Sequence, residues 1–142
     1  MIIVDTNVLS EPTRPSPSPR VLQWLDACDR STTFTTAITE AEILLGLALM
    51  PEGRRRAELE VQTRNLFVVE FAGRVLPFDS AAARAFPDIV VARKRSGRPI
   101  KEADAQIAAI ARAQGAAIAT RNTVDFESCG IALIDPWAAN AS

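Results

Sequence analysis

The chain has 142 residues, of which 48% are hydrophobic and 23% are charged, and its formal net charge is -1. This composition suits one globular domain with a core of its own and argues against disorder. No basic field covers the whole protein, so any contact with nucleic acid must come from a local patch. Histidine and tyrosine are absent, which excludes histidine-based triads and makes Cys/His zinc sites improbable, so an enzyme of this sequence must use carboxylates or a metal ion.

Targeting signals are not evident in the sequence. Met1 is followed by an apolar residue without a basic segment or a cleavage site, so we expect no signal peptide. The longest apolar run, residues 43–50, is too short for a membrane span. We therefore expect a cytoplasmic protein that makes no membrane contact, with Cys28 and Cys129 reduced.

The first predicted element is a buried strand at residues 2–4, which are all β-branched and apolar. It ends at Asp5, followed by Thr6 and Asn7, either of which is suited to cap a helical turn. In α/β sheets, ligands bind outside the carboxyl ends of strands, where Asp5 falls. Taken alone, Asp5 is better explained as part of a strand-ending turn, and a functional role depends on other carboxylates reaching the same place.

Four prolines at residues 12–19 predict an exposed loop before a short amphipathic helix at residues 21–25 and a strand at residues 32–36. Residues 39–50 form a helix that is apolar on nearly every side, so we expect it to be buried. Glu42 would then occupy a costly position for a carboxylate, with Gly46 one turn later leaving space beside it. The alternative is a half-exposed Glu42, or one paired with an arginine.

Residues 54–69 predict a more polar helix, and residues 75–78 a short extended segment. Asp79 or Ser80 caps the alanine-rich helix that follows, which Pro87 should kink or interrupt. The one basic concentration comes next and is predicted to lie in a loop, where it either faces solvent or holds a polyanion. Its members are Arg93, Lys94, Arg95, Arg98 and Lys101.

Residues 101–104 open an alanine-rich helix that continues over residues 105–114, and Asp104 lies in its first turn, where a negative charge also interacts favourably with the helix dipole. A buried strand at residues 116–120 then leads to Asn122 and Asp125, and residues 131–134 form a last strand, at an edge of the sheet. Strands that alternate with helices predict an α/β fold with a mainly parallel sheet of four to five strands.

Four carboxylates are thus expected to meet at one edge of the sheet: Asp5, Glu42, Asp104 and Asp125. Without a histidine or lysine partner they would repel one another and raise at least one pKa, unless a hard cation neutralises them. Mg²⁺ fits such all-oxygen ligands and phosphate substrates, and Mn²⁺ is a possible substitute.

Several segments, in their order and spacing, resemble PIN domains, specifically VapC toxins of type II toxin–antitoxin systems. They are Asp5-Thr6-Asn7, Ala41-Glu42-Ile43-Leu44-Leu45-Gly46, Ala103-Asp104, and Thr120-Arg121-Asn122 with Asp125-Phe126. Ser10-Glu11-Pro12 and Leu76-Pro77-Phe78-Asp79 are similar to the FitB subgroup. The resemblance runs from Met1 to Trp137 and implies a single three-layer α/β/α PIN domain over residues 1–142.

This resemblance also implies a Mg²⁺-dependent endoribonuclease that forms a homodimer and is inhibited by a VapB-like or FitA-like antitoxin. The complex would be a heterotetramer or larger, and DNA would be bound only through the antitoxin. Carried onto this chain, Asp5, Glu42 and Asp104 match the acidic positions of the family. The fourth acid is Asp125, with Asn122 as a neutral orienting group.

In the mechanism that we hypothesise, Asp5 and Asp104 hold Mg²⁺, and Glu42 and Asp125 complete the acidic cluster through water or a second ion. A water molecule then attacks the phosphorus atom in line with the leaving oxygen. Supporting roles fall to Thr6, Asn7, Thr120 and Asn122, and RNA phosphates would contact Arg93, Lys94, Arg95 and Arg98.

Two rival functions remain open at this stage. One is a PIN module that has lost catalysis and binds an antitoxin or nucleic acid. The other is an aspartyl-phosphate phosphatase with Asp5 as nucleophile. That second chemistry requires an acid two residues later, where this chain has Asn7.

Overall fold

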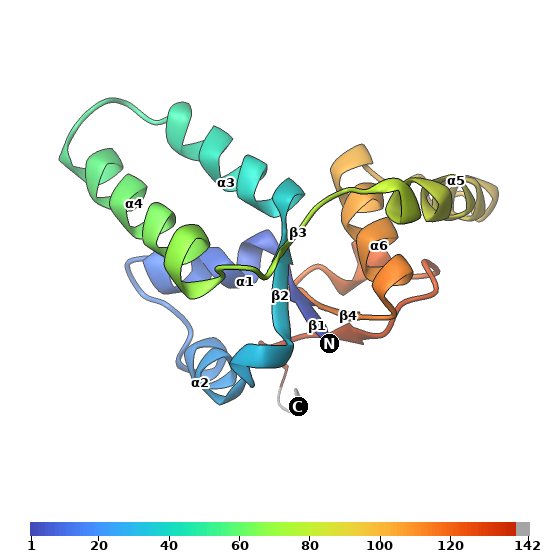
Figure 1. The fold of residues 1–142 in the computed structure, drawn as a ribbon, viewed down its shortest axis with the longest axis horizontal. Helices are drawn as coiled ribbons and strands as arrows, with labels where there is room; N and C mark the ends of the chain where they lie inside the picture. Colours follow the sequence, from blue (N-terminus) through green and yellow to red (C-terminus); the bar gives the residue numbers. More distant parts are fainter. Residues whose placement is uncertain (139–142) are drawn as a thin grey trace.

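The computed structural model describes residues 1–138, which build one five-stranded sheet with helices on both faces (Figure 1). The strand order is β3-β2-β1-β4-β5, and each neighbouring pair is parallel. The strands are β1 (Ile2–Val4), β2 (Thr33–Thr36), β3 (Val75–Leu76), β4 (Ala117–Ala119) and β5 (Leu133–Ile134). After β1 the chain first adds strands on one side and later on the other, so the topological switch point lies at the end of β1.

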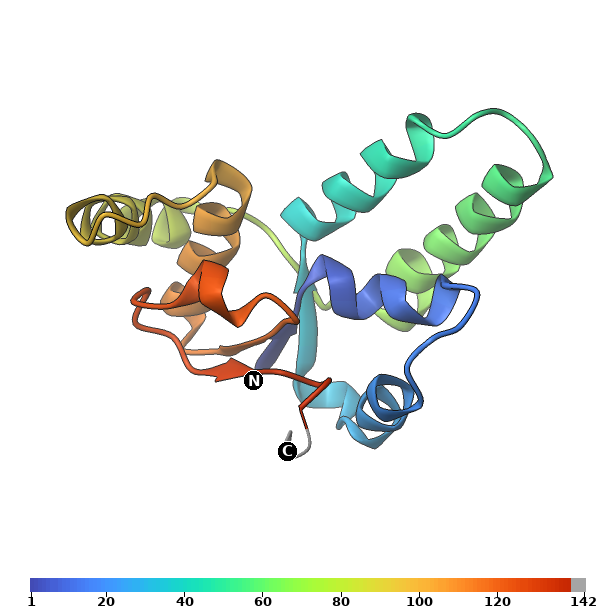
Figure 2. The ribbon, with the colours of Figure 1, turned by 180° about the vertical axis from the view of Figure 1, so that it is seen from behind.

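Helices cover the sheet in two layers, one on each face. Figures 1 and 2 show the molecule from opposite sides. One layer contains α1 (Thr6–Ser10), α2 (Pro19–Ala27), α3 (Ala37–Ala48) and α4 (Arg54–Asn65). The other contains α5 (Ser80–Arg95) and α6 (Glu102–Gln114). Shorter helical segments are η1 (Glu11–Thr13), η2 (Arg30–Thr32), the π-helical η3 (Leu66–Glu70) and η4 (Thr123–Phe126). The predicted three-layer α/β/α fold is confirmed. The last residues of the predicted domain, 139–142, lie outside the described residues.

The two faces of the sheet have separate cores because side chains of a strand alternate between faces. Ile3 packs with Ile107 and Ile118 beneath α5 and α6. The next residue, Val4, packs in the opposite core with Trp24 of α2. β1 is therefore apolar on both sides, and the first polar residue of the chain, Asp5, comes directly after it.

The prediction that the helix at residues 39–50 is buried is wrong. In α3 only Thr39 and Leu47 are buried, whereas Leu45 is 60% exposed and Leu49, just after the helix, is 76% exposed. α3 and α4 form a hairpin that projects from the sheet (Figure 1). α3 thus carries more apolar side chains than it buries against the rest of the chain.

The prediction that the basic residues 93–95 lie in a loop is wrong. α5 continues through Pro87 to Arg95, and only residues 96–101 form a loop. Cys28 and Cys129 are free thiols, as expected. Among residues 1–138, no helix combines the length and apolar character needed to cross a bilayer.

Candidate active site

Asp5 sits at the switch point of the sheet and is only 6% exposed. Its Oδ1 accepts a hydrogen bond of 2.8 Å from the backbone N–H of Thr6, so Asp5 itself caps α1. Its Oδ2 accepts a bond of 2.9 Å from the Thr120 hydroxyl. Burial raises the pKa of Asp5, these two hydrogen bonds oppose the rise, and the charge of Asp125 adds to it. The carboxylate is thus held in a fixed orientation in a place that disfavours its charge.

Thr120, at the end of β4, joins the supporting residues into one network. Besides donating to Asp5, its hydroxyl oxygen accepts the backbone N–H of Asn122 at 3.1 Å and the Asn7 side-chain amide at 3.4 Å. The side-chain Oδ1 of Asn7 in turn accepts a hydrogen bond of 3.2 Å from the backbone N–H of Arg121. Thr120 and Asn7 therefore tie the ends of β1 and β4 together, while Asn122 takes part through its backbone.

Glu42 reaches this site from the first half of α3. Its Oε1 accepts a hydrogen bond of 3.1 Å from the Thr6 hydroxyl. The side chain is exposed, which contradicts the expected burial, yet partial desolvation and the charge of Asp5 raise the pKa of Glu42 against the effect of Lys101. Glu42 faces the other acids without being enclosed.

Asp104 and Asp125 complete the cluster from two further elements, α6 and η4. Desolvation, followed by the charges of Asp5, Asp125 and Glu42, raises the pKa of Asp104 to about 6, and Lys101 opposes this rise. Asp5 and Asp125 follow strand ends and Glu42 and Asp104 lie on helices, and the four carboxylates come together at one edge of the sheet as predicted. Their catalytic roles stay predictions.

The donor set suits a hard divalent cation, because it consists of carboxylate oxygens from four elements with one lysine nearby. Among residues 1–138, however, no three acidic or cysteine side chains form a compact metal-binding group. Mg²⁺ commonly takes only one or two protein carboxylates and keeps several waters. The residues therefore fit Mg²⁺ held largely through water better than a fully protein-enclosed ion.

The predicted RNA-contacting residues differ in their surroundings. Lys94 and Arg95 are exposed, and Arg98 is exposed but donates to the Val124 carbonyl and, at 2.5 Å, to the Glu127 carboxylate. Arg93 is 5% exposed and donates to backbone carbonyls, so the prediction that it contacts RNA is contradicted.

One cation near the acids, Lys101, was missing from the predicted set. Lys101 influences both Glu42 and Asp104, and its place in the basic run, just before Asp104, was the signal for it. Arg121 donates its backbone N–H to Asn7 in the network around Thr120, and its guanidinium lies 5.1 Å from the centre of the Trp137 ring. This contact joins residues too far apart in sequence to be recognised from a local pattern.

A comparison with protein families matches residues 2–129 to the PIN domain. The chain belongs to the PIN-domain family. Asp5, Glu42, Asp104 and Asp125 all lie within the matched residues, at the end of the sheet where this PIN domain gathers its acids. The expected family resemblance is confirmed.

Two relatives match this PIN domain over nearly its whole length. "VapC ribonuclease Y4jK" of Sinorhizobium fredii is 44% identical over 96% of the chain and 98% of the relative. "Toxin FitB" of Neisseria gonorrhoeae is 40% identical over 96% of the chain and 99% of the relative. A solved chain described as "Structure of FitAB bound to IR36 DNA fragment" superimposes with a TM-score of 0.92 at 40% identity, covering 97% of this chain and 96% of that one. The similarity therefore extends to both helical layers.

Proposed function

We propose that this PIN domain is a Mg²⁺-dependent endoribonuclease and the toxin of a type II toxin–antitoxin pair. The observation that carries the proposal is the gathering of Asp5, Glu42, Asp104 and Asp125 at the switch point of the sheet, where burial and mutual repulsion raise three of their pKa values. Such a cluster is unfavourable unless a cation binds there. Relatives named as a ribonuclease and a toxin support the same function.

A divalent cation would supply the Lewis-acid chemistry for hydrolysis of a phosphodiester bond. Asp5 and Asp104 would hold it, with Asp5 kept in orientation by Thr6 and Thr120. Glu42, which accepts a hydrogen bond from the Thr6 hydroxyl and is open to solvent, would orient the attacking water and take its proton. Asp125 would complete the acidic cluster.

RNA phosphates would reach the site along its exposed cations. Lys94, Arg95 and Arg98 lie around the α5–α6 connection, and Lys101 lies beside Asp104 and Glu42. Each phosphate contact releases counterions, so binding should weaken as salt rises. Two free cysteines are consistent with action in the cytoplasm.

The test is cleavage of total RNA by antitoxin-free protein with Mg²⁺ or with EDTA. We expect cleavage only with Mg²⁺ and its loss in Asp5→Asn and Glu42→Gln. Asp88→Asn, which removes an exposed carboxylate of α5 outside the site, should cleave like the wild type. Cleavage that continues in EDTA, or in Asp5→Asn purified by an identical procedure, would contradict the proposed mechanism.

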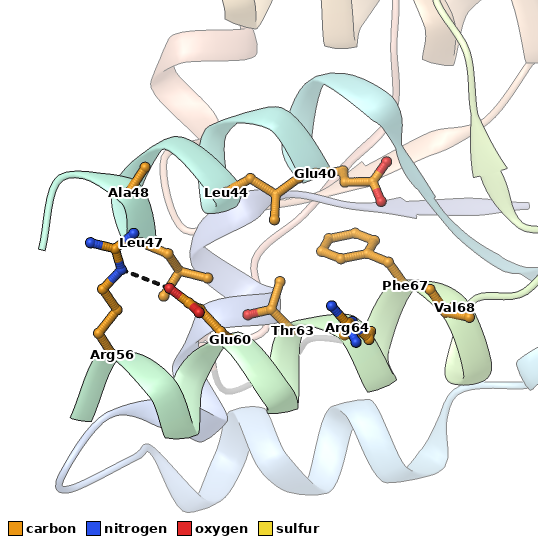
Figure 3. A pocket seen from close by; sticks show the side chains of 10 residues that line it. All are labelled: Glu40, Leu44, Leu47, Ala48, Arg56, Glu60, Thr63, Arg64, Phe67 and Val68. Carbon is orange, nitrogen blue, oxygen red and sulfur yellow. Dashed lines mark hydrogen bonds and ion pairs between the residues drawn. The ribbon is translucent and has the colours of Figure 1, made fainter. Parts of the chain in front are cut away.

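The exposed apolar residues of the α3–α4 hairpin support a protein partner. Two grooves open at this hairpin. The one of about 370 Å³ lies between α3 and α4 and reaches Glu40, Leu44 and Val68 (Figure 3). The other, of about 470 Å³, extends to Thr6 and Glu42. A partner that filled the second groove would also cover the acidic site. We infer that the cognate VapB-like or FitA-like antitoxin docks here, and that DNA is bound only through it.

The partner proposal is tested with the protein encoded beside this chain. Co-purification and loss of nuclease activity on mixing are expected, and light scattering should show a heterotetramer or a larger assembly built on a toxin homodimer. Stable association that left RNA cleavage unchanged would place the partner elsewhere on the surface.

A further inference from the structure

The Arg93 side chain, in the last turn of α5, joins two segments that are far apart in sequence. Its Nε donates to the Arg98 carbonyl at 2.7 Å. Its Nη1 donates to the carbonyls of Asp125 and Glu127 at 2.6 and 3.1 Å. One guanidinium therefore connects the loop after α5 with the turn after β4.

The surroundings of this guanidinium are unusual because a buried charge is costly and is normally paired with an opposite charge. Arg93 is 5% exposed, and its oxygen acceptors are all backbone carbonyls. The rigid fork of arginine can satisfy several carbonyls at once, whereas a lysine ammonium is a point charge on a flexible stem. The residue is thus suited to fixing backbone segments relative to each other.

One of the fixed segments carries Asp125. The Asp125 N–H donates to the Asn122 carbonyl at 3.0 Å, and its carbonyl accepts from Arg93. Both backbone polar groups of this residue are therefore engaged, although its side chain is exposed. The same turn is held again by Arg98, which donates to the Val124 carbonyl at 3.3 Å.

The other segment leads to Asp104. The Arg98 N–H donates to the Arg93 carbonyl at 3.0 Å, while the Arg98 carbonyl accepts from the Arg93 side chain, so the start of the loop is closed from both directions. This loop ends at Lys101, the residue directly before α6, and Asp104 lies in the first turn of that helix.

We propose that Arg93 is a positioning residue that holds the turn bearing Asp125 against the loop leading to Asp104, and so sets the separation of these two carboxylates. The inference rests on the proposed nuclease function and extends it. Arg93 itself touches neither RNA nor the metal ion. The effect of Asp125 on the pKa of Asp104 agrees with this placement.

The test compares Arg93→Lys and Arg93→Met with Arg84→Met, which removes an exposed arginine from the same helix. Mn²⁺ affinity is measured by calorimetry without RNA, and kcat and KM are measured with an oligoribonucleotide. Outer-shell partners of metal ligands typically contribute about 10-fold or more to affinity or activity. We expect about 10-fold weaker Mn²⁺ binding and a lower kcat at little-changed KM in Arg93→Met. Arg93→Lys should lie between it and the wild type, and Arg84→Met should match the wild type.

A coupled variant separates positioning from general destabilisation. If Arg93 acts through Asp125, adding Arg93→Lys to Asp125→Asn should change Mn²⁺ affinity by less than about twofold, because both substitutions remove the same contribution to metal binding. Arg93→Lys serves as the decisive variant if Arg93→Met does not fold. A folded Arg93→Lys protein with wild-type Mn²⁺ affinity and kcat overturns this inference alone. A wild-type protein that binds no Mn²⁺ and cleaves no RNA overturns the proposed function and this inference together.

Discussion

Replacement of Asp104 by asparagine should stabilise the metal-free protein at neutral pH. The raised pKa of Asp104, about 6 against an ordinary 3.8, means that the folded state disfavours its charge. Well below pH 3.8 the Asp104 carboxyl group is protonated in both the folded and the unfolded state, so it does not lower the free energy of unfolding. Between pH 3.8 and about 6 the unfolded chain ionises at this position while the folded protein still holds the proton, so the wild type loses stability that the asparagine variant keeps, and above about pH 6 the loss is complete.

The size of the effect follows from the gap between the two pKa values, which corresponds to about 3 kcal/mol for a fully enclosed group. Asp104 is only half-buried, so solvent screening reduces this to about 1–2 kcal/mol. The substitution also removes a favourable interaction with the N-terminus of α6, of about 0.5 kcal/mol. The expected net gain is about 1 kcal/mol, or about 3–5 °C in Tm.

Urea unfolding in EDTA at pH 4, 5.5 and 7.5 measures this gain, with Asp88→Asn as a control that should show none. The advantage of Asp104→Asn should grow with pH. Added Mg²⁺ should then stabilise the wild type through binding to the folded state, and the variant much less. A variant that is less stable than the wild type at pH 7.5, with its Mg²⁺ stabilisation intact, would refute the electrostatic account of the site.

Three further changes test other parts of the structure. Thr120→Val removes the donor to Asp5 and the acceptor for the Asn122 N–H, and should lower the free energy of unfolding by about 1–3 kcal/mol in urea titrations. Ile107→Ala, in the fully buried face of α6, should cost about 2–5 kcal/mol in the same assay, and a smaller loss would show that this core can close around the cavity. Leu44→Asp should leave stability within about 0.5 kcal/mol, because Leu44 is exposed, yet weaken antitoxin binding in a titration, because Leu44 lines the groove between α3 and α4; unchanged binding would remove this face from the interface.

The sequence was most informative where local chemistry and topology agree. The strand at residues 2–4 ends in Asp5, and a parallel sheet brings the ends of its strands to one edge, so the meeting of Asp5 with Asp125 followed from alternating strands and helices. Asp104 was found in the first helical turn because a helix start is marked locally. These predictions needed no knowledge of side-chain packing.

Two predictions from the sequence failed for lack of the tertiary context. A helix that is apolar on all sides is normally buried, but α3 leaves Leu44 and Leu45 exposed. The apolar pattern alone does not distinguish a helix that packs in the core from one that offers its apolar surface to a partner. Arg93 looked like one more cation in a basic run. Its inward direction depends on carbonyls of Asp125 and Glu127, more than thirty residues away, which no local pattern reveals.

The strands at the two edges of the sheet, β3 and β5, have two residues each. So short an edge presents few unpaired N–H and C=O groups on which another chain could extend the sheet. Amyloid-like growth by strand addition is therefore disfavoured, although the molecule exposes large apolar side chains on its helices. Self-association at high concentration should be reversible and helix-mediated, without the spectroscopic signature of intermolecular β-structure.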